Sequence, residues 1–182
     1  FNGPQKITPF AFDRWMEILK RTPGSVLWLL ETHPETAARL REQARARGVD
    51  SDRLVFAPKQ PNPVHLARYP LADLFLDTAP YGAHTTASDA LWMSVPVLTL
   101  SGRSFASRVC GSLVRSAGAP ELVCETAEDY VERAVALGQD REATRALRER
   151  LEAGRSTCVL FDMDLLVRSV EDLLHEMAAE HQ

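Results

Sequence analysis

The stretch that decides the fold is LFLDTAPYGAHTTASDALW, residues 74–92. A short apolar run ends at Asp77, a turn containing Gly82 follows, and a helical pattern begins at His84. An apolar run of this length that passes through a glycine turn into a helical period predicts a buried strand followed by a helix. The first turn of that helix carries one imidazole and two hydroxyls. The stretch therefore predicts a strand–turn–helix unit whose helix begins with polar side chains.

The start of this helix is suited to an anion. The first N–H groups of a helix lack intrahelical acceptors and carry a partial positive charge, so they bind phosphate or diphosphate groups. Thr85 and Thr86 follow His84 there, and Asp89 lies four residues after Thr85 on the same face, where it can accept hydrogen bonds from ribose hydroxyls. The alternative is that a threonine only caps the helix and His84 decorates the turn. The pattern indicates a nucleotide site and leaves that alternative open.

Strands and helices alternate along the rest of the chain. Apolar runs predict strands at 25–30, 53–56, 74–77, 95–100 and 122–124. Helical periods predict helices at 10–21, 34–47, 63–69, 85–93 and 105–117, two within 128–154, and one at 163–180. This order predicts an α/β fold, a doubly wound parallel (Rossmann-like) sheet with right-handed crossovers, and the run at 25–30 is expected to be covered on both faces. Without a linker or an internal repeat, residues 1–182 are expected to form one domain.

The composition excludes several classes of protein. A net charge of −4 with 21 basic and 25 acidic residues argues against a nucleic-acid surface. No apolar run approaches the roughly 20 residues that cross a bilayer, and no leader precedes the first helix, so we expect a cytoplasmic protein without membrane contact. The odd set Cys110, Cys124 and Cys158 predicts reduced thiols instead of disulfides or a metal cluster. The abrupt start without methionine suggests a piece of a longer chain.

Ligands of such sheets bind beyond the carboxyl ends of the strands. Residues 59–68, 78–89 and 101–103 each follow a predicted strand and are expected to converge on one crevice. His65 and Arg68 share a helix face, where they either contact a base or are surface polar residues. Lys6, in a Gly-Pro loop, either holds a diphosphate as a point charge or is a solvated loop lysine.

The pair Asp162 and Asp164 has the Asp-x-Asp pattern with which some glycosyltransferases hold a metal ion. It opens the last predicted helix, where acidic residues complement the helix dipole, so capping is the favoured role. The sequence has neither a metal-ligand spacing nor a Walker-type loop. We therefore expect a site that works without a metal ion or other cofactor.

The chain resembles the carboxyl-terminal catalytic half of the O-linked N-acetylglucosaminyltransferases. The matching elements are Phe1-Asn2 with Lys6-Ile7, the runs 25–30 and 71–78, His-Thr-Thr-x-x-Asp-x-Leu-Trp at 84–92, and Ala-Ser-Arg-Val at 106–109. Eighteen Arg against three Lys, with abundant Ala, indicate a GC-rich gene and hence a bacterial member.

The resemblance implies the second half of a GT-B glycosyltransferase. Such an enzyme transfers N-acetylglucosamine from UDP-N-acetylglucosamine to Ser or Thr hydroxyls of proteins, with inversion and without metal, and this half binds the donor. The implied partners are the donor, the protein acceptor, the amino-terminal catalytic half and a tetratricopeptide-repeat arm. By position, Lys6 neutralises the charge that develops on the departing UDP. Thr85 and Thr86 cradle the diphosphate, and His84 lies against the same donor.

The other implied contacts involve the nucleoside and the sugar. His65 matches the histidine that stacks on uracil, Arg68 its polar partner, and Asp89 the carboxylate on the ribose. Backbone groups near Lys59 and Gln60 are expected to read the uracil edge. Leu30 is expected near the sugar pocket.

Two positions depart from the pattern of the animal enzymes, which have a glutamine at Gly3 and a lysine at Asn62. Charge-assisted hydrogen bonds of that kind are each worth about 1.5–3 kcal/mol, so their loss weakens donor binding unless something compensates. One alternative is a Spindly-like protein O-fucosyltransferase that uses GDP-fucose, which we expect to lack His84 and to carry Glu in place of Asp89. A non-catalytic binding or scaffolding domain is the other alternative.

Overall fold

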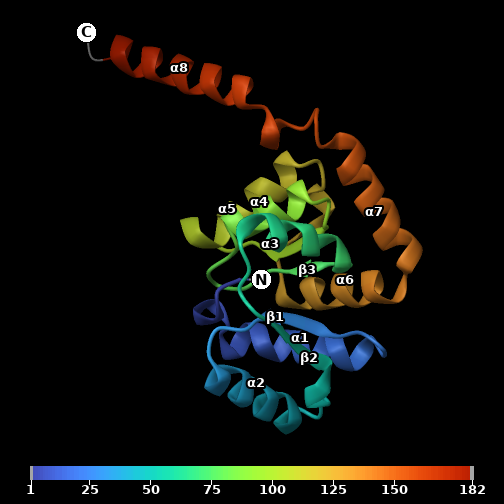
Figure 1. The fold of residues 1–182 in the computed structure, drawn as a ribbon. Helices are drawn as coiled ribbons and strands as arrows, with labels where there is room; N and C mark the ends of the chain where they lie inside the picture. Colours follow the sequence, from blue (N-terminus) through green and yellow to red (C-terminus); the bar gives the residue numbers. More distant parts are fainter. Residues whose placement is uncertain (1, 181–182) are drawn as a thin grey trace.

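The computed structural model describes residues 2–180 (Figure 1), so Phe1 of the matched segment lies outside the described residues. The α-helices are α1 (Pro9–Arg21), α2 (Pro34–Ala46), α3 (Asn62–Arg68), α4 (Thr85–Trp92), α5 (Phe105–Ser116), α6 (Ala127–Gln139), α7 (Arg141–Gly154) and α8 (Met163–Glu180). The strands are β1 (Leu27–Leu30), β2 (Leu54–Ala57), β3 (Phe75–Leu76), β4 (Val97–Leu100) and β5 (Val123–Cys124). Short 3₁₀ turns are η1 (Pro4–Lys6), η2 (Ser51–Arg53), η3 (Tyr69–Leu71), η4 (Pro120–Leu122) and η5 (Val159–Phe161). The predicted order of strands and helices is confirmed, with bounds that differ by a few residues.

All strand pairs are parallel, which confirms the predicted α/β class. β1 pairs with β2, and β3, β4 and β5 pair in that order. Within residues 2–180 these are two hydrogen-bonded ladders, whereas one continuous sheet was expected. β3 is only two residues long, and the N–H groups of Phe75 and Asp77 are bonded to the carbonyls of β4 and the residue before it. So short a strand has few backbone N–H and C=O groups left that could form hydrogen bonds with β1.

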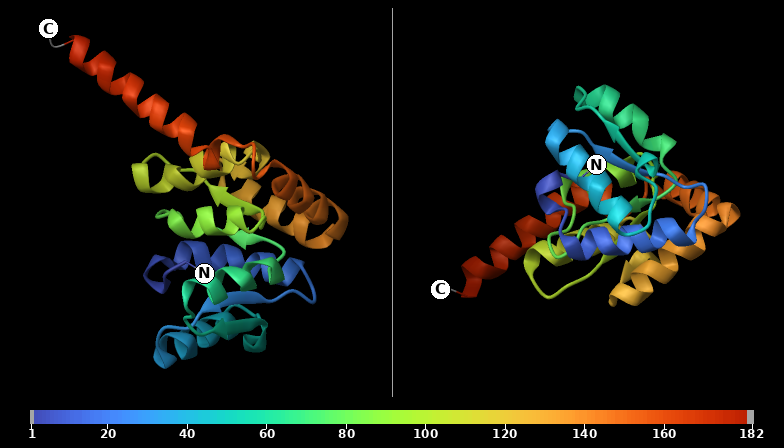
Figure 2. Two further views of the ribbon diagram at one scale, coloured as in Figure 1. Left: turned by 45° about the horizontal axis from the view of Figure 1, so that its top comes forward. Right: turned by 90° about the horizontal axis from the view of Figure 1, so that it is seen from below.

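The core is centred on β4. Val97, Leu98 and Thr99 are fully buried, α5 and α6 pack on β4, and α1 packs on α6. α1 carries buried apolar residues at helical spacing, including Phe12, Trp15, Met16 and Leu19, which is why it lies against the core. Figure 2 shows helices arranged around the strands, with α8 projecting away from them.

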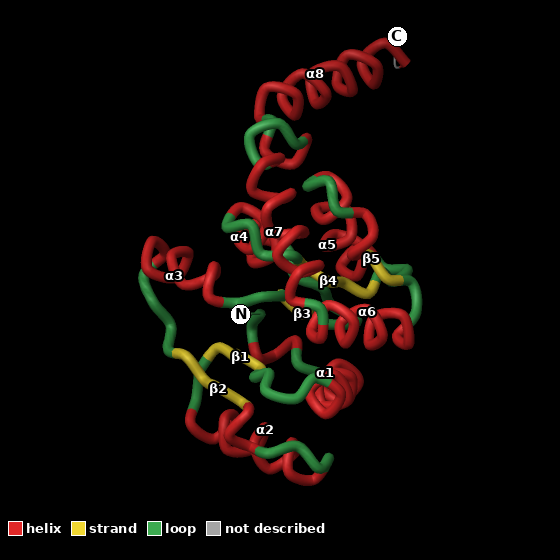
Figure 3. The backbone as a smooth tube through the Cα atoms, turned by 90° about the vertical axis from the view of Figure 1, so that its right-hand side faces the viewer, coloured by secondary structure: helices red, strands yellow, loops and turns green. Residues whose placement is uncertain are grey.

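The expectation that the run at 25–30 is covered on both faces is wrong. Leu29 is the buried residue of β1, and Val26, just before the strand, is 58% exposed. β1 and β2 lie beside α2, apart from β3, β4 and β5 (Figure 3), so they form an edge of the described structure. The apolar run at 25–30 could not distinguish an edge strand from a central one.

The last helix, α8, leaves the body of the molecule after η5 (Figure 1). Its apolar side chains are exposed: Leu165, Leu166, Val167, Val170, Leu173, Leu174 and Met177. Asp162 Oδ1 accepts a hydrogen bond from Leu165 N at 2.8 Å, which confirms the predicted capping role. Of the helices in the described part of the chain, none combines the length and apolarity that a bilayer crossing requires.

Candidate donor-binding site

The loop between β3 and α4 is held from below by the carboxylate of Asp77. Oδ1 accepts hydrogen bonds from Ala83 N at 2.7 Å and Thr78 N at 2.8 Å, and Oδ2 accepts one from Thr99 Oγ1 at 2.7 Å. Asp77 is only 3% exposed. Burial raises the pKa of Asp77, and these hydrogen bonds act in the opposite direction. A buried carboxylate with these donors fixes the course of the loop.

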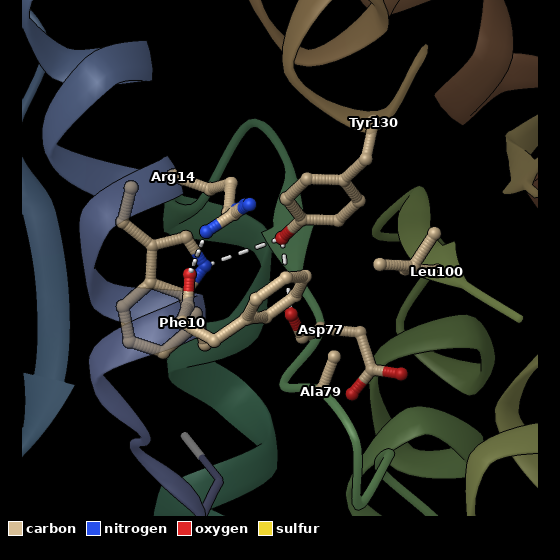
Figure 4. A pocket seen from close by; sticks show the side chains of 8 residues that line it. Phe10, Arg14, Asp77, Ala79, Leu100 and Tyr130 are labelled. Carbon is tan, nitrogen blue, oxygen red and sulfur yellow. Dashed lines mark hydrogen bonds between the residues drawn. The ribbon is translucent and has the colours of Figure 1, made fainter. Parts of the chain in front are cut away.

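The backbone of Asp77 is held from the opposite side by α1 and α6. Trp15 Nε1 donates to Tyr130 Oη at 3.2 Å, and that hydroxyl donates to the Asp77 carbonyl at 3.0 Å. In Figure 4 the Tyr130 hydroxyl meets the Asp77 backbone while the carboxylate points away from it. The cavity beside them has a volume of only about 10 Å³, about the least that one water molecule needs, so it is part of the core and is too small for a nucleotide.

Lys6 reaches this loop from the amino-terminal segment. Its Nζ donates to the Gly82 carbonyl at 2.8 Å and lies 4.2 Å from the centre of the Tyr81 ring. Burial lowers the pKa of the Lys6 ammonium, and the charge of Asp77 opposes that shift. Gly82 lies three residues before Thr85, so the structure places the amine near the start of α4, as the predicted diphosphate site requires.

α4 begins with Thr85 and Thr86, and His84 is its N-cap residue. The His84 side chain makes no capping hydrogen bond, and both threonines lie in the first turn instead of at the cap, so the capping alternative is wrong. Thr85 is exposed, while the Thr86 hydroxyl donates to Asn2 Oδ1 at 2.9 Å. Within residues 2–180, the N–H groups of Thr85 and Thr86 have no hydrogen-bond acceptor, as expected at a helix start.

His84 lies among aromatic rings. It stacks on Tyr81 with ring centres 5.3 Å apart and meets the edge of Phe105 at 6.3 Å. The Ala106 carbonyl accepts from Gly82 N at 3.0 Å and lies 3.5 Å from His84 Nε2. The segment after β4 therefore reaches the site through Ala106, and within residues 2–180 no hydrogen bond joins residues 101–103 to the loop before α4.

A second group of predicted residues gathers where α3 faces α4. The Arg68 guanidinium contacts His65 Nδ1 at 2.8 Å and donates to the Pro58 carbonyl at 2.8 Å. Burial, aided by the charge of Arg68, lowers the pKa of His65, and the Asp89 carboxylate opposes this. Burial raises the pKa of Asp89, and His65 opposes that shift. The geometric link between the two helices is Tyr69, whose ring lies 5.0 Å from that of His65 and whose hydroxyl donates to the Thr86 carbonyl of α4 at 3.4 Å.

The remaining predicted residues line the same end of the strands. Leu30 is the last residue of β1 and is half-buried, and Gln60 lies in the loop from β2 to α3, one residue after the exposed Lys59. In the described part of the chain, no hydrogen bond or ring contact ties Leu30 or Gln60 to the other predicted residues. Their roles stay predictions.

The sequence reasoning did not single out Asn2 as a functional residue. Asn2 Nδ2 donates to Thr78 Oγ1 at 2.8 Å and to Asp77 Oδ1 at 3.2 Å, while Oδ1 accepts from Thr86. Asn2 therefore ties the segment that carries Lys6 to both the end of β3 and the start of α4. Its side chain bonds to residues more than 70 positions away, which no local pattern reveals.

The sequence analysis expected a site without a metal ion and three reduced thiols. Across residues 2–180, no group of three His, Cys, Asp or Glu side chains is arranged to hold a metal ion. Cys110, Cys124 and Cys158 are free, which confirms the prediction of unpaired thiols.

Comparison with known proteins places this geometry in a family. Residues 1–170 match glycosyl transferase family 41. The chain is 38% identical over 177 residues to a UDP-N-acetylglucosamine–peptide N-acetylglucosaminyltransferase of Caenorhabditis elegans, covering 97% of this chain and 15% of that protein. It is 31% identical over 182 residues to a probable enzyme of the same description, SPINDLY, of Solanum lycopersicum, covering 97% and 19%.

A solved structure agrees with these relatives. The chain superimposes on a mutant O-GlcNAc transferase of Thermobaculum terrenum with a TM-score of 0.92 and 38% identity, covering 97% of this chain and 35% of that one. The chain spans less than a fifth of the length of the two curated relatives. By sequence and by fold, the chain belongs to glycosyl transferase family 41.

Proposed function

We propose that residues 1–182 form a single domain that binds the donor of a UDP-N-acetylglucosamine:protein O-N-acetylglucosaminyltransferase. The observation that carries the proposal is the contact of Lys6 with the loop that leads into α4, where Thr85 and Thr86 present N–H groups. Together they form a positively polarised site for a diphosphate without a metal ion. Family membership supports the choice of reaction.

In the proposed reaction, a Ser or Thr hydroxyl of an acceptor protein attacks the anomeric carbon of the sugar. The new carbon–oxygen bond forms as the bond to the diphosphate breaks, which inverts the configuration. The acceptor proton passes to a base outside these residues. The Lys6 ammonium donates a hydrogen bond to the departing diphosphate, whose negative charge grows in the transition state. One of its three N–H groups is already held by Gly82, which orients the amine.

The group where α3 faces α4 is proposed to bind the nucleoside. His65 stacks on uracil with Arg68 beside it, and Asp89 accepts hydrogen bonds from the ribose hydroxyls. The lowered pKa of His65 supports this role, because a neutral ring stacks on a base without the cost of desolvating a charge. The segment around Gln60 reads the uracil edge, and Leu30 borders the sugar. His84 lies against the donor between Tyr81 and Phe105.

The side chain of Gln5 offers compensation for the missing glutamine at Gly3. A Cβ placed on Gly3 would lie 2.5 Å from the Gln5 amide atoms, so this amide occupies the space that a side chain at position 3 would use. We propose that Gln5 supplies the amide donor to the phosphate. Asn62 opens α3 and is exposed, and we propose that its amide takes the place of the lysine.

The rest of the catalytic region is proposed to lie elsewhere in the same polypeptide, as an amino-terminal half and a tetratricopeptide-repeat arm. The chain covers 35% of the related solved chain, which supports this division. Residues 1–182 alone are therefore expected to bind UDP weakly and to transfer no sugar.

Calorimetric titration of UDP and GDP into a polypeptide with both halves tests the proposed donor. UDP is expected to bind more tightly, and Thr85→Val is expected to weaken it by removing a hydroxyl at the diphosphate. Thr157→Val, an exposed threonine between α7 and η5, is the matched control. A preference for GDP would reject the proposal in favour of a protein O-fucosyltransferase. Binding without transfer to any acceptor would favour a scaffolding domain.

A further inference from the structure

We propose that Asp77 is the residue that positions Lys6 and shapes the loop before α4 for the reaction. This role gains its catalytic meaning from the proposed function. The Asp77 side chain is buried under the loop, so it acts through its neighbours and is a positioning residue.

The connection between the two side chains is a single peptide unit. Ala83 N donates to Asp77 Oδ1 at 2.7 Å, and the Gly82 carbonyl of the same peptide accepts from Lys6 Nζ at 2.8 Å. In a planar trans peptide the N–H and the C=O point in opposite directions. By holding the N–H, the carboxylate turns the carbonyl toward Lys6. A negative acceptor on the N–H also polarises the peptide and strengthens its carbonyl as an acceptor.

The surroundings leave this carboxylate little freedom. Donors from Asn2, Thr78 and Thr99 meet its two oxygens in addition to Ala83 N. A Cβ placed on the adjacent Gly82 would lie 3.0 Å from Oδ2, so the loop runs directly over the carboxylate. The four donors oppose the burial that raises the pKa of Asp77.

Few other charged groups compete with the interaction between Asp77 and Lys6. The titratable groups that face the pair are Cys110 of α5, Tyr130 of α6 and Tyr81 of the loop itself. Burial raises the pKa of Cys110 and of Tyr130 well above their ordinary values, so both are neutral. Tyr81 meets Lys6 through its ring face. Asp77 is therefore the negative group that keeps the Lys6 ammonium protonated against its desolvation.

The test is the pH dependence of kcat for sugar transfer, measured on the polypeptide with both halves. Asp77→Asn preserves an oxygen for Ala83 N and places an amide against the Thr99 hydroxyl. It therefore removes the charge but keeps the shape of the side chain. Without that charge Lys6 loses its proton more easily. The fall in kcat at high pH, the basic limb of the profile, is therefore expected to begin about 1 pH unit lower. Thr99→Val removes one donor from the carboxylate and should move the limb the same way by less.

Tyr130→Phe is the matched structural control. It removes the hydroxyl that supports the Asp77 backbone, so it is expected to lower the melting temperature without moving the basic limb. Asp77→Asn and Thr99→Val profiles that coincide with the parent profile would overturn the proposal. An equal displacement of the limb by Tyr130→Phe would also overturn it.

A second readout does not depend on catalysis. The 182-residue chain contains only three lysines, at positions 6, 20 and 59, so ¹³C-lysine NMR resolves the titration of Lys6. Asp77→Asn is expected to lower the Lys6 midpoint and to leave the other two unchanged. If the polypeptide with both halves transfers no N-acetylglucosamine but this midpoint falls, the proposed function is wrong and the positioning role stands. If transfer occurs and the midpoint stays, the positioning role is wrong.

Discussion

At the scale of single residues, Lys6 has a contact that a fully solvated loop lysine would not have. Its ammonium bonds to the Gly82 carbonyl beside the start of α4. We predict that Lys6→Ala lowers kcat by about 10²–10³-fold, because it removes a charge aimed at the leaving group. UDP affinity should fall much less, since the N–H groups of α4 that are proposed to bind the diphosphate remain. Steady-state kinetics and calorimetry measure the two effects.

Lys20→Ala is the control for that experiment, because Lys20 is exposed on α1. It should leave both kcat and UDP affinity unchanged. Equal losses of kcat and affinity in Lys6→Ala would mean that the amine binds the ground state and has no special role in departure of UDP.

The buried carboxylate of Asp77 predicts a pH dependence of stability. Its pKa is raised in the folded protein by burial, so the folded state holds this proton at pH values where the unfolded chain has released it. The free energy of unfolding contributed by Asp77 is then fully present below the unfolded pKa, about 3.9, and is lost as pH rises through the folded pKa. Urea unfolding of the parent and Asp77→Asn from pH 4 upward should show the parent losing stability relative to the variant. The opposite trend would show that the hydrogen bonds outweigh burial.

At the scale of elements, the loop between β3 and α4 depends on close approach at Gly82. A Cβ there would lie 3.0 Å from Asp77 Oδ2, which the Thr99 hydroxyl holds, and 3.4 Å from the backbone carbonyl of Ala106. We predict that Gly82→Ala lowers the free energy of unfolding by about 1–3 kcal/mol, as overpacking does. Chemical denaturation measures this change.

Gly154→Ala provides the comparison, because a Cβ at the end of α7 meets nothing within 4 Å. This change should be neutral or should stabilise by up to about 1 kcal/mol, since alanine favours a helix. If both variants lose the same stability, the loop is not tightly packed at Gly82.

The sequence predicted the elements well because their patterns are local. The helical period of α1 and the glycine turn before α4 each lie within about a dozen residues. The pairing of His65 with Arg68 also followed from their spacing on one helix. The bridging role of Asn2 did not, because its partners lie at positions 77, 78 and 86. The exposure of β1 was not predicted either, because a run of apolar residues does not show which elements pack against it.

At the scale of the whole molecule, α8 presents an apolar stripe that the described residues leave uncovered. Leu166, Val170 and Leu173 recur at helical spacing and are all exposed. Exposed apolar surfaces of this kind mark contact sites. We expect the stripe to pack on the amino-terminal half of the catalytic region, which is proposed to lie elsewhere in the same polypeptide.

Leu173→Asp tests this packing. In a polypeptide with both halves it should lower the free energy of unfolding by about 2 kcal/mol or more, because it buries a charge in an apolar contact. In the 182-residue chain it should have little effect. Glu171→Ala changes the same helix without touching the stripe and serves as the control. An equal effect of Leu173→Asp on both proteins would contradict the predicted contact.

The tie formed by Asn2 has a practical consequence for anyone who labels this protein. A fluorescent reporter inserted next to Asn2 would crowd the anchor that joins β3 to α4, and a flexible spacer would be needed to keep the amine of Lys6 in place. Reporters inserted in the exposed turn after α2, around Gly48, avoid that anchor altogether.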